Sequence, residues 1–496
     1  MFVFGIPFWL LSIICLPAMS QAQEDMPISV FLDEIMNPEN RSRTLTYTNK
    51  NFINDLAGLQ VNQYLKQNFE DVSITKGLVD ISKNLKINNC RFGSGLYLDS
   101  LNFKALQINN SDAAIIRIQN CSFSVLYISE TKSPNIELKS LTIDKALTLK
   151  ESRATKILLR DLNTNGNISL GDNQVGTIEV YNSTFNFPSE GFFKNYRFNE
   201  VESIDLIMIE NTFNGDSASN VELQYNYTNL IVEDNQFDVD FYLLRSSVKE
   251  RFIMVNNEFH KRVSFENFIF SETKNELYWD QFEGYKLAYS KNGQIFAAMT
   301  PEGFQDEVKF KNLIATYKEM HRIFLGRGDL ESANACYNEM KELQGLRHKY
   351  IYDTEGGFNN LFRWILNRLL KIYTNHGTDP ALAVVISFYV ILTFAVFYFF
   401  FPSEWDKESK MNLIKDYRLQ VKENKGHKPK SFLILVGILF LSLLNAITLS
   451  LNAFVTLGFG TIPTTGVARY LCIVQGFLGW FLLSIFTVAL INQVLA

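Results

Sequence analysis

The sequence predicts a right-handed parallel β-solenoid, followed by an α-helical hairpin and an all-α transmembrane segment. Apolar residues alternate in short runs that recur every ten or eleven residues between 71 and 270. The apolar period becomes helical between 300 and 352, and long runs with almost no charge follow after 381. A chain of 496 residues is too long for one compact core, so we expect several domains.

The repeat consists of pairs of apolar residues separated by one residue. Polar turns between the pairs often end in an aromatic residue, as in Asn120-Cys121-Ser122-Phe123 and Asn182-Ser183-Thr184-Phe185. This alternation is typical of short strands with one inward face, and Asn tolerates left-handed turn geometry. Two steps would form one coil, with Leu, Ile and Phe stacked inside it. The regular pairs are Leu85/Ile87, Leu96/Leu98, Leu106/Ile108, Ile116/Ile118, Leu126/Ile128, Ile136/Leu138, Leu147/Leu149, Ile157/Leu159, Ile168/Leu170 and Ile178/Val180.

The repeat region resembles the pentapeptide-repeat proteins, in which apolar residues two apart face the interior and Cys or Ser occupies the corners. Few quintets here have the A-D-L-x-x form, so the resemblance implies less square coils than in that family. Residues 23–70 precede the regular repeat, and we expect them to form an N-terminal cap.

The N-terminus and the composition restrict the compartment and the partners. Residues 1–22 form an apolar run ending in Ser-Gln-Ala, typical of a signal peptide cleaved after Ala22, although an uncleaved anchor helix is an alternative. Five Cys and five His are scattered along the chain, so we expect no disulfide framework, metal site or cofactor. A net charge of −5 without a basic stripe argues against nucleic acid as a partner.

Two helical segments lead to the apolar runs. Residues 300–352 predict a helical hairpin like one tetratricopeptide unit, broken near Gly326 and restarted with Asp329 as N-cap. Residues 358–375 predict an amphipathic helix with Arg363, Arg368 and Lys371 opposite its apolar face. Such a helix can lie at the membrane interface.

The membrane part, 381–496, is predicted to contain a transmembrane helix at 381–401 and a hydrophobic segment at 431–456. The second half of that segment, about 445 to 455, is expected to be a pore helix. A further helix at 467–493 is long enough to return across a bilayer. The loop at 402–430 has eight Lys and Arg against five acidic residues.

Thr456 to Gly460 reads T-L-G-F-G, close to the T-V-G-Y-G loop that replaces the hydration shell of potassium with backbone carbonyls. Gly458 and Gly460 reach positive φ without a Cβ penalty, as alternating carbonyls require. A helix, a re-entrant helix, a Gly-rich loop and a helix in this order resemble the two-transmembrane potassium-channel module of bacteria.

That resemblance implies a homotetramer in the bacterial cell membrane that conducts a monovalent cation, with the lipid bilayer as its other partner. It assigns the filter to Thr456, Leu457, Gly458, Phe459 and Gly460. The lining falls on the inner helix from Val474 to Thr487, and a gating hinge on Gly476 or Gly479, where close helix packing is an equal alternative. Phe459 replaces the usual Tyr and Thr461 the usual Asp, so selectivity for potassium over sodium stays open.

Topology is ambiguous. A cleaved signal peptide would place the solenoid outside the cytoplasm, which we expect, but then Ser431 to Leu444 must cross. Fourteen residues rise only about 21 Å, short for a core of about 30 Å. A retained N-terminus would place the solenoid in the cytoplasm with two crossings.

Two functions without conduction remain as alternatives. One is a membrane-anchored β-helix enzyme acting on polysaccharide, which would need two carboxylates at a set separation. Carboxylates do occur in the turns, but without a recognisable motif, so we do not expect an enzyme. The other is an anchored adhesin or scaffold. The turn carboxylates are Asp99, Asp112, Asp144, Asp161 and Asp172.

Overall fold

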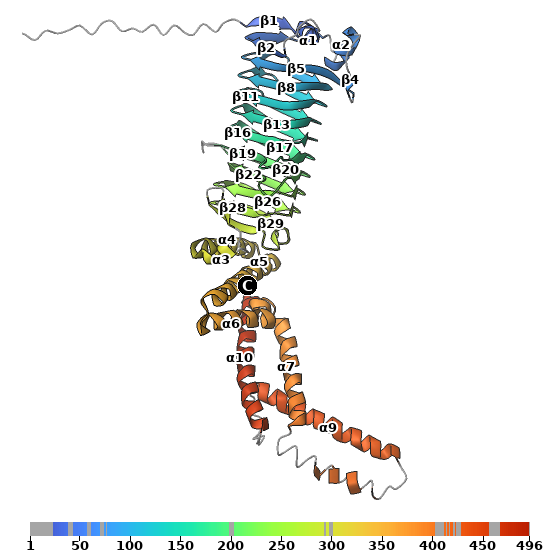
Figure 1. Ribbon diagram of the computed structural model, residues 1–496, viewed down its shortest axis with the longest axis vertical. Coiled ribbons are helices and arrows are strands. Elements are labelled where there is room, and N and C mark those ends of the chain that lie inside the picture. Colours follow the sequence, from blue (N-terminus) through green and yellow to red (C-terminus); the bar gives the residue numbers. More distant parts are fainter. Residues whose placement is uncertain are drawn as a thin grey trace, which may run out of the picture. The chain divides into compact units, whose positions relative to one another are not determined.

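The computed structural model divides the chain into two compact units, Met1–Phe296 and Ala297–Ala496, which we describe separately (Figure 1). The structure describes residues 23–37, 43–56, 61–69, 74–75, 77–197, 203–291, 294–296, 301–401, 411–412, 414–415, 417–419, 422, 428–455 and 467–495. The predicted signal peptide at 1–22 lies outside these residues.

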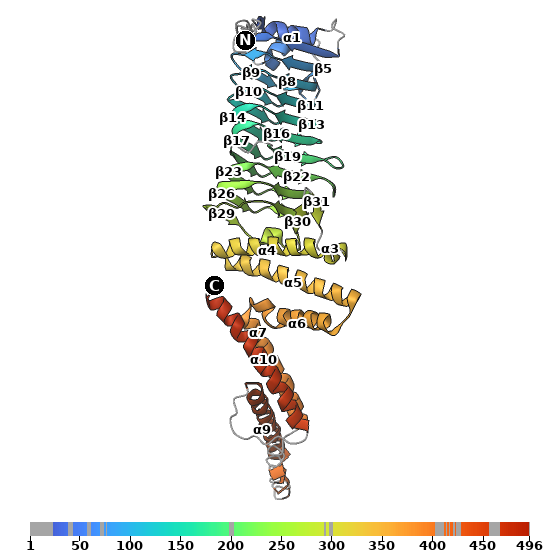
Figure 2. The same ribbon diagram turned by 90° about the vertical axis from the view of Figure 1, so that its left-hand side faces the viewer.

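The first unit is a parallel β-solenoid of about nine turns, as the repeat predicts (Figure 2). One face stacks equivalent strands of successive coils in parallel. Ile116 pairs with Ile136, Ile136 with Ile157, and Ile157 with Ile178. Among the described residues this sheet has the strands β7 (Leu96–Asp99), β10 (Ile116–Gln119), β12 (Asn135–Lys139), β14 (Arg153–Arg160), β17 (Gln174–Tyr181), β20 (Ile204–Ile209), β23 (Asn226–Glu233), β26 (Ser247–Val255) and β29 (Lys274–Leu277).

The second face stacks the alternate pairs of the repeat. Leu85 pairs with Leu106, and Leu106 with Leu126, so two steps of the sequence repeat make one coil. The strands in order are β2 (Thr44–Thr48), β5 (Leu78–Asn88), β8 (Leu101–Asn109), β11 (Ser122–Ser129), β13 (Thr142–Lys150), β16 (Asn167–Gly171), β19 (Phe192–Tyr196), β22 (Asn220–Gln224), β25 (Asp240–Leu244), β28 (Val263–Glu266) and β30 (Leu287–Lys291).

Short strands complete the coils at their corners. One stack contains β1 (Glu24–Pro27), β3 (Lys50–Ile53), β6 (Arg91–Phe92) and β9 (Asp112–Ala113). Another contains β15 (Asn163–Thr164), β18 (Thr184–Asn186), β21 (Thr212–Asn214), β24 (Gln236–Phe237) and β27 (Glu258–Phe259). The antiparallel strands β4 (Ile74–Thr75) and β31 (Gln294–Phe296) pair with β5 and β30.

The turn aromatics form a column inside the solenoid. Phe213 stacks between Phe185 and Phe237, with ring centroids 4.8 and 4.9 Å away, and its side chain is fully buried. Offset stacking adds to the burial of each ring because the positive ring edge meets the negative face of its neighbour.

Buried asparagines form a second column, which joins the corners. The backbone N–H of Asn211 donates to Oδ1 of Asn235, and the backbone N–H of Asn235 donates to Oδ1 of Asn257. The corner residue before each of the three, as at Asn256, has positive φ. Each amide thus satisfies a backbone donor that a buried corner would otherwise leave unpaired.

Two helices lie at the N-terminal end of the solenoid. In α1 (Ile28–Met36) the side chains of Phe31, Leu32 and Ile35 are buried, and Phe31 packs edge-on against Phe52 of β3. The helix α2 (Val61–Asn68) contacts the first strand of the nine-stranded sheet, β7.

The second unit is helical. After α3 (Pro301–Gln305), the predicted hairpin appears as α4 (Glu307–Gly326) and α5 (Leu330–Glu355), and the carboxylate of Asp329 caps α5 by accepting from the backbone N–H of Ser332. The amphipathic segment forms α6 (Phe358–Thr374), and the turn η2 (Asn375–Gly377) leads from it into the apolar part.

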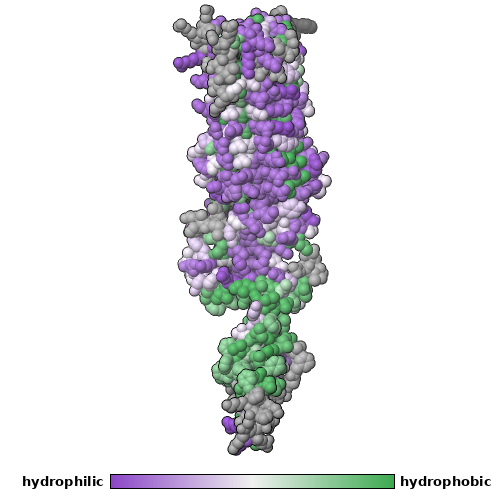
Figure 3. Space-filling view, turned by 90° about the vertical axis from the view of Figure 1, so that its right-hand side faces the viewer, coloured by the Kyte–Doolittle hydropathy of each residue, from purple (hydrophilic) through white to green (hydrophobic). Residues whose placement is uncertain are grey.

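Three described helices are long and apolar enough to cross a membrane. They belong to α7 (Pro380–Phe400), α9 (Lys428–Val455) and α10 (Val467–Leu495). In a space-filling view, apolar residues dominate the surface of these helices, whereas the visible solenoid surface is mostly hydrophilic (Figure 3). The expected pore helix does not form a separate element, because α9 is continuous from Lys428 to Val455.

The aromatic column gives a test of the solenoid core. Phe213→Ala should lower the free energy of unfolding by about 3–5 kcal/mol, because it removes a buried ring from between two others. Urea unfolding followed by the β-strand circular dichroism signal measures this. The control Ile269→Ala, at a side chain that is 66% exposed, should change stability by no more than about 0.5 kcal/mol. Equal effects of the two substitutions would contradict the column.

Candidate functional site

The candidate site is the segment between α9 and α10 and the helices that hold its ends. All five filter residues assigned from the sequence, Thr456, Leu457, Gly458, Phe459 and Gly460, lie outside the described residues. The described helices nevertheless fix where this segment begins and ends.

Two buried clusters align the three helices at different heights. The first, which we call the α7-end cluster, contains Tyr398, Ala446, Leu449 and Ala468. It joins the last turn of α7 to the middle of α9 and the first turn of α10. The second, the α7-start cluster, contains Tyr373, Ala383, Phe454 and Leu482. It joins the first turn of α7 to the last turn of α9 and to a later part of α10.

These clusters give the direction of each helix. Passing from the α7-end cluster to the α7-start cluster, α9 runs from Ala446 to Phe454 and α10 from Ala468 to Leu482. Over the same interval α7 runs backwards, from Tyr398 to Ala383. Therefore α9 and α10 both proceed from the level of the end of α7 toward the level of its start, although α9 is inclined to the other two helices (Figure 1).

A buried polar network lies between the clusters. The side chain of Gln475, which is fully buried, accepts a hydrogen bond from the Tyr398 hydroxyl at 2.9 Å and donates to Oγ of Ser450 at 2.7 Å. The Ser450 hydroxyl in turn donates to the backbone carbonyl of Ile391 at 2.7 Å. Each member has a partner, so the network links all three helices without leaving these polar groups unsatisfied.

The helices α9 and α10 approach each other closely at Gly479. A Cβ atom on Gly479 would lie 2.0 Å from the carbonyl oxygen of Phe454. Only glycine permits this approach, which supports the close-packing alternative for Gly479. Gly476 is half-buried in the same uninterrupted helix. The hinge role assigned to either glycine remains a prediction.

Of the predicted inner-helix lining, Val474 to Thr487, only part lies on an exposed face of α10. Val474 and Phe477 are 58% and 71% exposed, and Thr487 is exposed as well. The buried residues Gln475, Gly479 and Leu482 face α7 and α9 instead.

The helix α6 has two opposite faces. Asn367 donates to the backbone carbonyl of Lys341 on α5, and Lys371 forms an ion pair with Glu342 at 2.5 Å. The other face is apolar and exposed, with Phe358 81% exposed. The residues of that face are Phe358, Phe362, Ile365 and Ile372.

The turn η2 joins α6 to α7 and contacts α10. Its His376 has positive φ, and its half-buried side chain has an Nε2 with no hydrogen-bond partner among the described residues. Burial lowers the pKa of His376 to about 4, so the imidazole is neutral at pH 7. The titratable groups around it are Lys341 and Glu342 of α5 and Lys371 of α6.

Two of the turn carboxylates considered for an enzyme bond asparagines at the corners of the solenoid. Asp161 accepts a hydrogen bond from Asn182 in the next coil at 2.7 Å, and Asp99 accepts one from Asn120 at 2.9 Å. The network of Gln475 with Tyr398 and Ser450 was not predicted from the sequence. A glutamine inside a long apolar run was its only sequence signal.

No protein-family model, curated protein or solved structure matches this chain.

The contact at Gly479 can be tested with a matched glycine. Gly479→Ala should destabilise the detergent-solubilised protein by about 1–3 kcal/mol, because the new methyl group pushes α9 and α10 apart. The destabilisation is measured as a lower thermal midpoint. The control is Gly437→Ala in α9, where a Cβ would meet nothing within 4 Å. This control should be neutral or slightly stabilising, since alanine favours helix over glycine by about 1 kcal/mol. An unchanged midpoint for Gly479→Ala would refute the close contact.

Proposed function

We propose that this protein is a subunit of a cation channel in which one pore loop from each of four chains forms a filter of backbone carbonyls. The observation that carries the proposal is that α9 and α10 both proceed from the level of the end of α7 toward the level of its start. The chain between two such consecutive helices has to return toward the level of the end of α7.

The end of α9 and the start of α10 lie at different heights along α10. α9 ends beside Gly479, which is twelve residues, or about 18 Å along the helix, beyond the start of α10 at Val467. Residues 456–466 must cover this distance. If α7 and α10 span a bilayer, this backbone lies at a depth without bulk water. Irregular backbone is stable there only when it is buried in protein or lines an aqueous cavity.

The composition of the returning segment fits a filter. T-L-G-F-G places glycines at alternate positions, as needed for successive carbonyls to point in one direction. Rings of such carbonyls replace the hydration shell of a cation. One segment supplies only part of each ring, so we infer a homotetramer with potassium as the expected ion.

The exposed face of α10 is suited to line the path below the filter. Ser484 and Thr487 donate their hydroxyls to the backbone carbonyls of Trp480 and Leu483 in their own helix. These side chains are therefore satisfied without a partner from another chain, and they offer hydroxyl oxygens to a passing ion.

The same arrangement gives a membrane topology with two crossings, by α7 and α10. The start of α7 and the late part of α10 share the α7-start cluster, so they lie on one side of the membrane. The described residues before Pro380 contain no candidate span, so the solenoid remains on that side too. In this topology Ser431–Leu444 need not cross, which removes the length conflict, and the apolar face of α6 meets the lipid interface.

Potassium flux into liposomes tests conduction. Wild-type protein should carry a saturable potassium current, and Gly458→Asp should reduce it to the level of empty liposomes, because a side chain at this position blocks the carbonyl path. Gly437→Ala, in open space on α9, should retain wild-type flux. Chemical cross-linking should give tetramers for all three proteins, which separates loss of conduction from loss of assembly.

Equal flux with Gly458→Asp would refute the filter assignment. Absence of flux in tetrameric wild-type protein would favour the anchored scaffold.

Cysteine labelling in intact cells tests the topology. A membrane-impermeant maleimide should reach a cysteine at Ser169, on the solenoid, from the same side as a tag after Ala496. It should reach a cysteine at Met411 only from the opposite side. The three cysteines of the solenoid and hairpin, Cys90, Cys121 and Cys336, are buried and give little background. Labelling of the C-terminal tag and Ser169 from opposite sides would indicate three crossings and would contradict the returning segment.

A further inference from the structure

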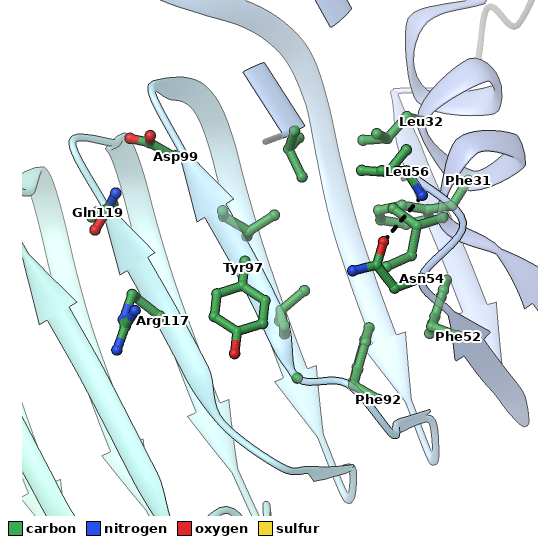
Figure 4. Close-up of a pocket in the computed structure, with 15 residues that line it drawn as sticks. Phe31, Leu32, Phe52, Asn54, Leu56, Phe92, Tyr97, Asp99, Arg117 and Gln119 are labelled. Carbon is green, nitrogen blue, oxygen red and sulfur yellow. Dashed lines mark hydrogen bonds between the residues drawn. The ribbon is translucent and has the colours of Figure 1, made fainter. Parts of the chain in front are cut away.

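The first coils of the solenoid border a partly open cavity that is unrelated to the proposed pore, with Tyr97 43% exposed at its edge. It lies between the N-terminal helices and the strands β7 and β10, and its volume is about 200 Å³. In Figure 4, Arg117 and Gln119 lie on one side of Tyr97, and the residues of the N-terminal cap lie on the other side of Tyr97. The apolar part of its wall includes Phe31, Leu32, Phe52, Leu56, Phe92 and Leu96.

The cavity exists because β7 is an edge strand. In the described part of the chain, β7 pairs with β10 and is the last strand of its sheet. The backbone N–H groups of Leu96 and Ser100 donate toward β10 and its flanks. The backbone groups of neighbouring residues in a strand point to alternate edges, so the N–H and C=O groups of Tyr97 and Asp99 point to the other edge of β7. At this edge β7 is near the helix α2, not another strand.

Uncommitted polar groups gather at this cavity. The side-chain oxygen of Asn54 accepts from the backbone N–H of Leu56 at 3.1 Å, which leaves its amide nitrogen facing the strand of Tyr97 (Figure 4). The Tyr97 hydroxyl and the Gln119 amide have no hydrogen-bond partner among the described residues. Each of these three groups can bond a ligand.

The charged side chains at the cavity already have partners. The Arg117 guanidinium binds the Glu137 carboxylate at 2.9 and 3.3 Å. Asp99 accepts hydrogen bonds from Asn120 and from Ser100. A charged ligand would have to compete with these partners, so the site favours a neutral molecule.

The volume limits the ligand to a single ring. An apolar protein cavity of about 150 Å³ holds benzene, so one of this size accepts a ring with a small substituent. We propose that this cavity is a binding site for a small neutral aromatic molecule that carries one hydrogen-bonding group, with the ring among the apolar side chains and the polar group toward Gln119, Tyr97 and Asn54.

The probe for this site is 4-fluorophenol, followed by ¹⁹F NMR on the full chain in detergent. We expect a saturable shift that adds to the linear partitioning into micelles, and no saturable shift for the charged 4-fluorobenzoate. Gln119→Leu should weaken 4-fluorophenol binding about threefold to tenfold, the value of one neutral hydrogen bond. The control Gln107→Leu, which alters an outward-facing residue of β8 on the other sheet, should bind like wild type.

Leu56→Trp fills the cavity and should abolish the saturable part. Its fold is checked by the β-strand circular dichroism signal and by unchanged tetramer formation. The proposal is overturned if wild-type protein shows only linear partitioning, if 4-fluorobenzoate saturates the same site, or if Leu56→Trp folds and still binds. If 4-fluorophenol binds Gln119→Leu with wild-type affinity, the proposed hydrogen bond with Gln119 is wrong.

Discussion

A polypeptide needs a partner for every peptide group wherever water is absent, and this requirement shapes both units. In the solenoid each coil finds its partners in the coils before and after it. In α7, α9 and α10 the peptide groups bond within their own helix. Irregular backbone at membrane depth would have to be buried in protein or line an aqueous cavity, which is why the proposed filter needs the carbonyl path of a pore.

The solenoid keeps its register although its coils differ in length. From Ile157 to its partner Ile178 one coil takes 21 residues, whereas from Ile178 to its partner Leu206 the next takes 28. The coil lengthens between β18 and β19 and again between β19 and β20, and the strands after each point pair as before. The Phe column and the Asn column explain this tolerance, since both fix residues next to the corners rather than the corner loops themselves.

Much of this architecture could be predicted from the sequence because its signals are local. Pairs such as Leu106/Ile108 have period two, and Asp329 precedes a helical run, so strands and cap follow from neighbouring residues. The arrangement of α7, α9 and α10 could not be predicted in this way. Hydrophobicity identifies each helix, but the direction of α9 depends on contacts such as Phe454 with Gly479, which are distant in sequence.

The candidate site likewise has a part that a local motif predicts and a part that depends on contacts distant in sequence. The T-L-G-F-G motif suggested backbone chemistry at once, whereas Gln475 could be recognised as a junction only after Ser450 and Tyr398 had been placed beside it. The cavity at β7 could not be predicted from the sequence either, because it forms where the first coil lacks a strand that would pair with the outer edge of β7.

The Asn column has a further implication for how the solenoid can change over evolutionary time. Because Asn211, Asn235 and Asn257 each bond the equivalent residue one coil away, any whole coil that carries the same amide can be inserted or lost while its neighbours keep their bonding. The length of the rod is thus adjustable in steps of one coil without redesign of either end.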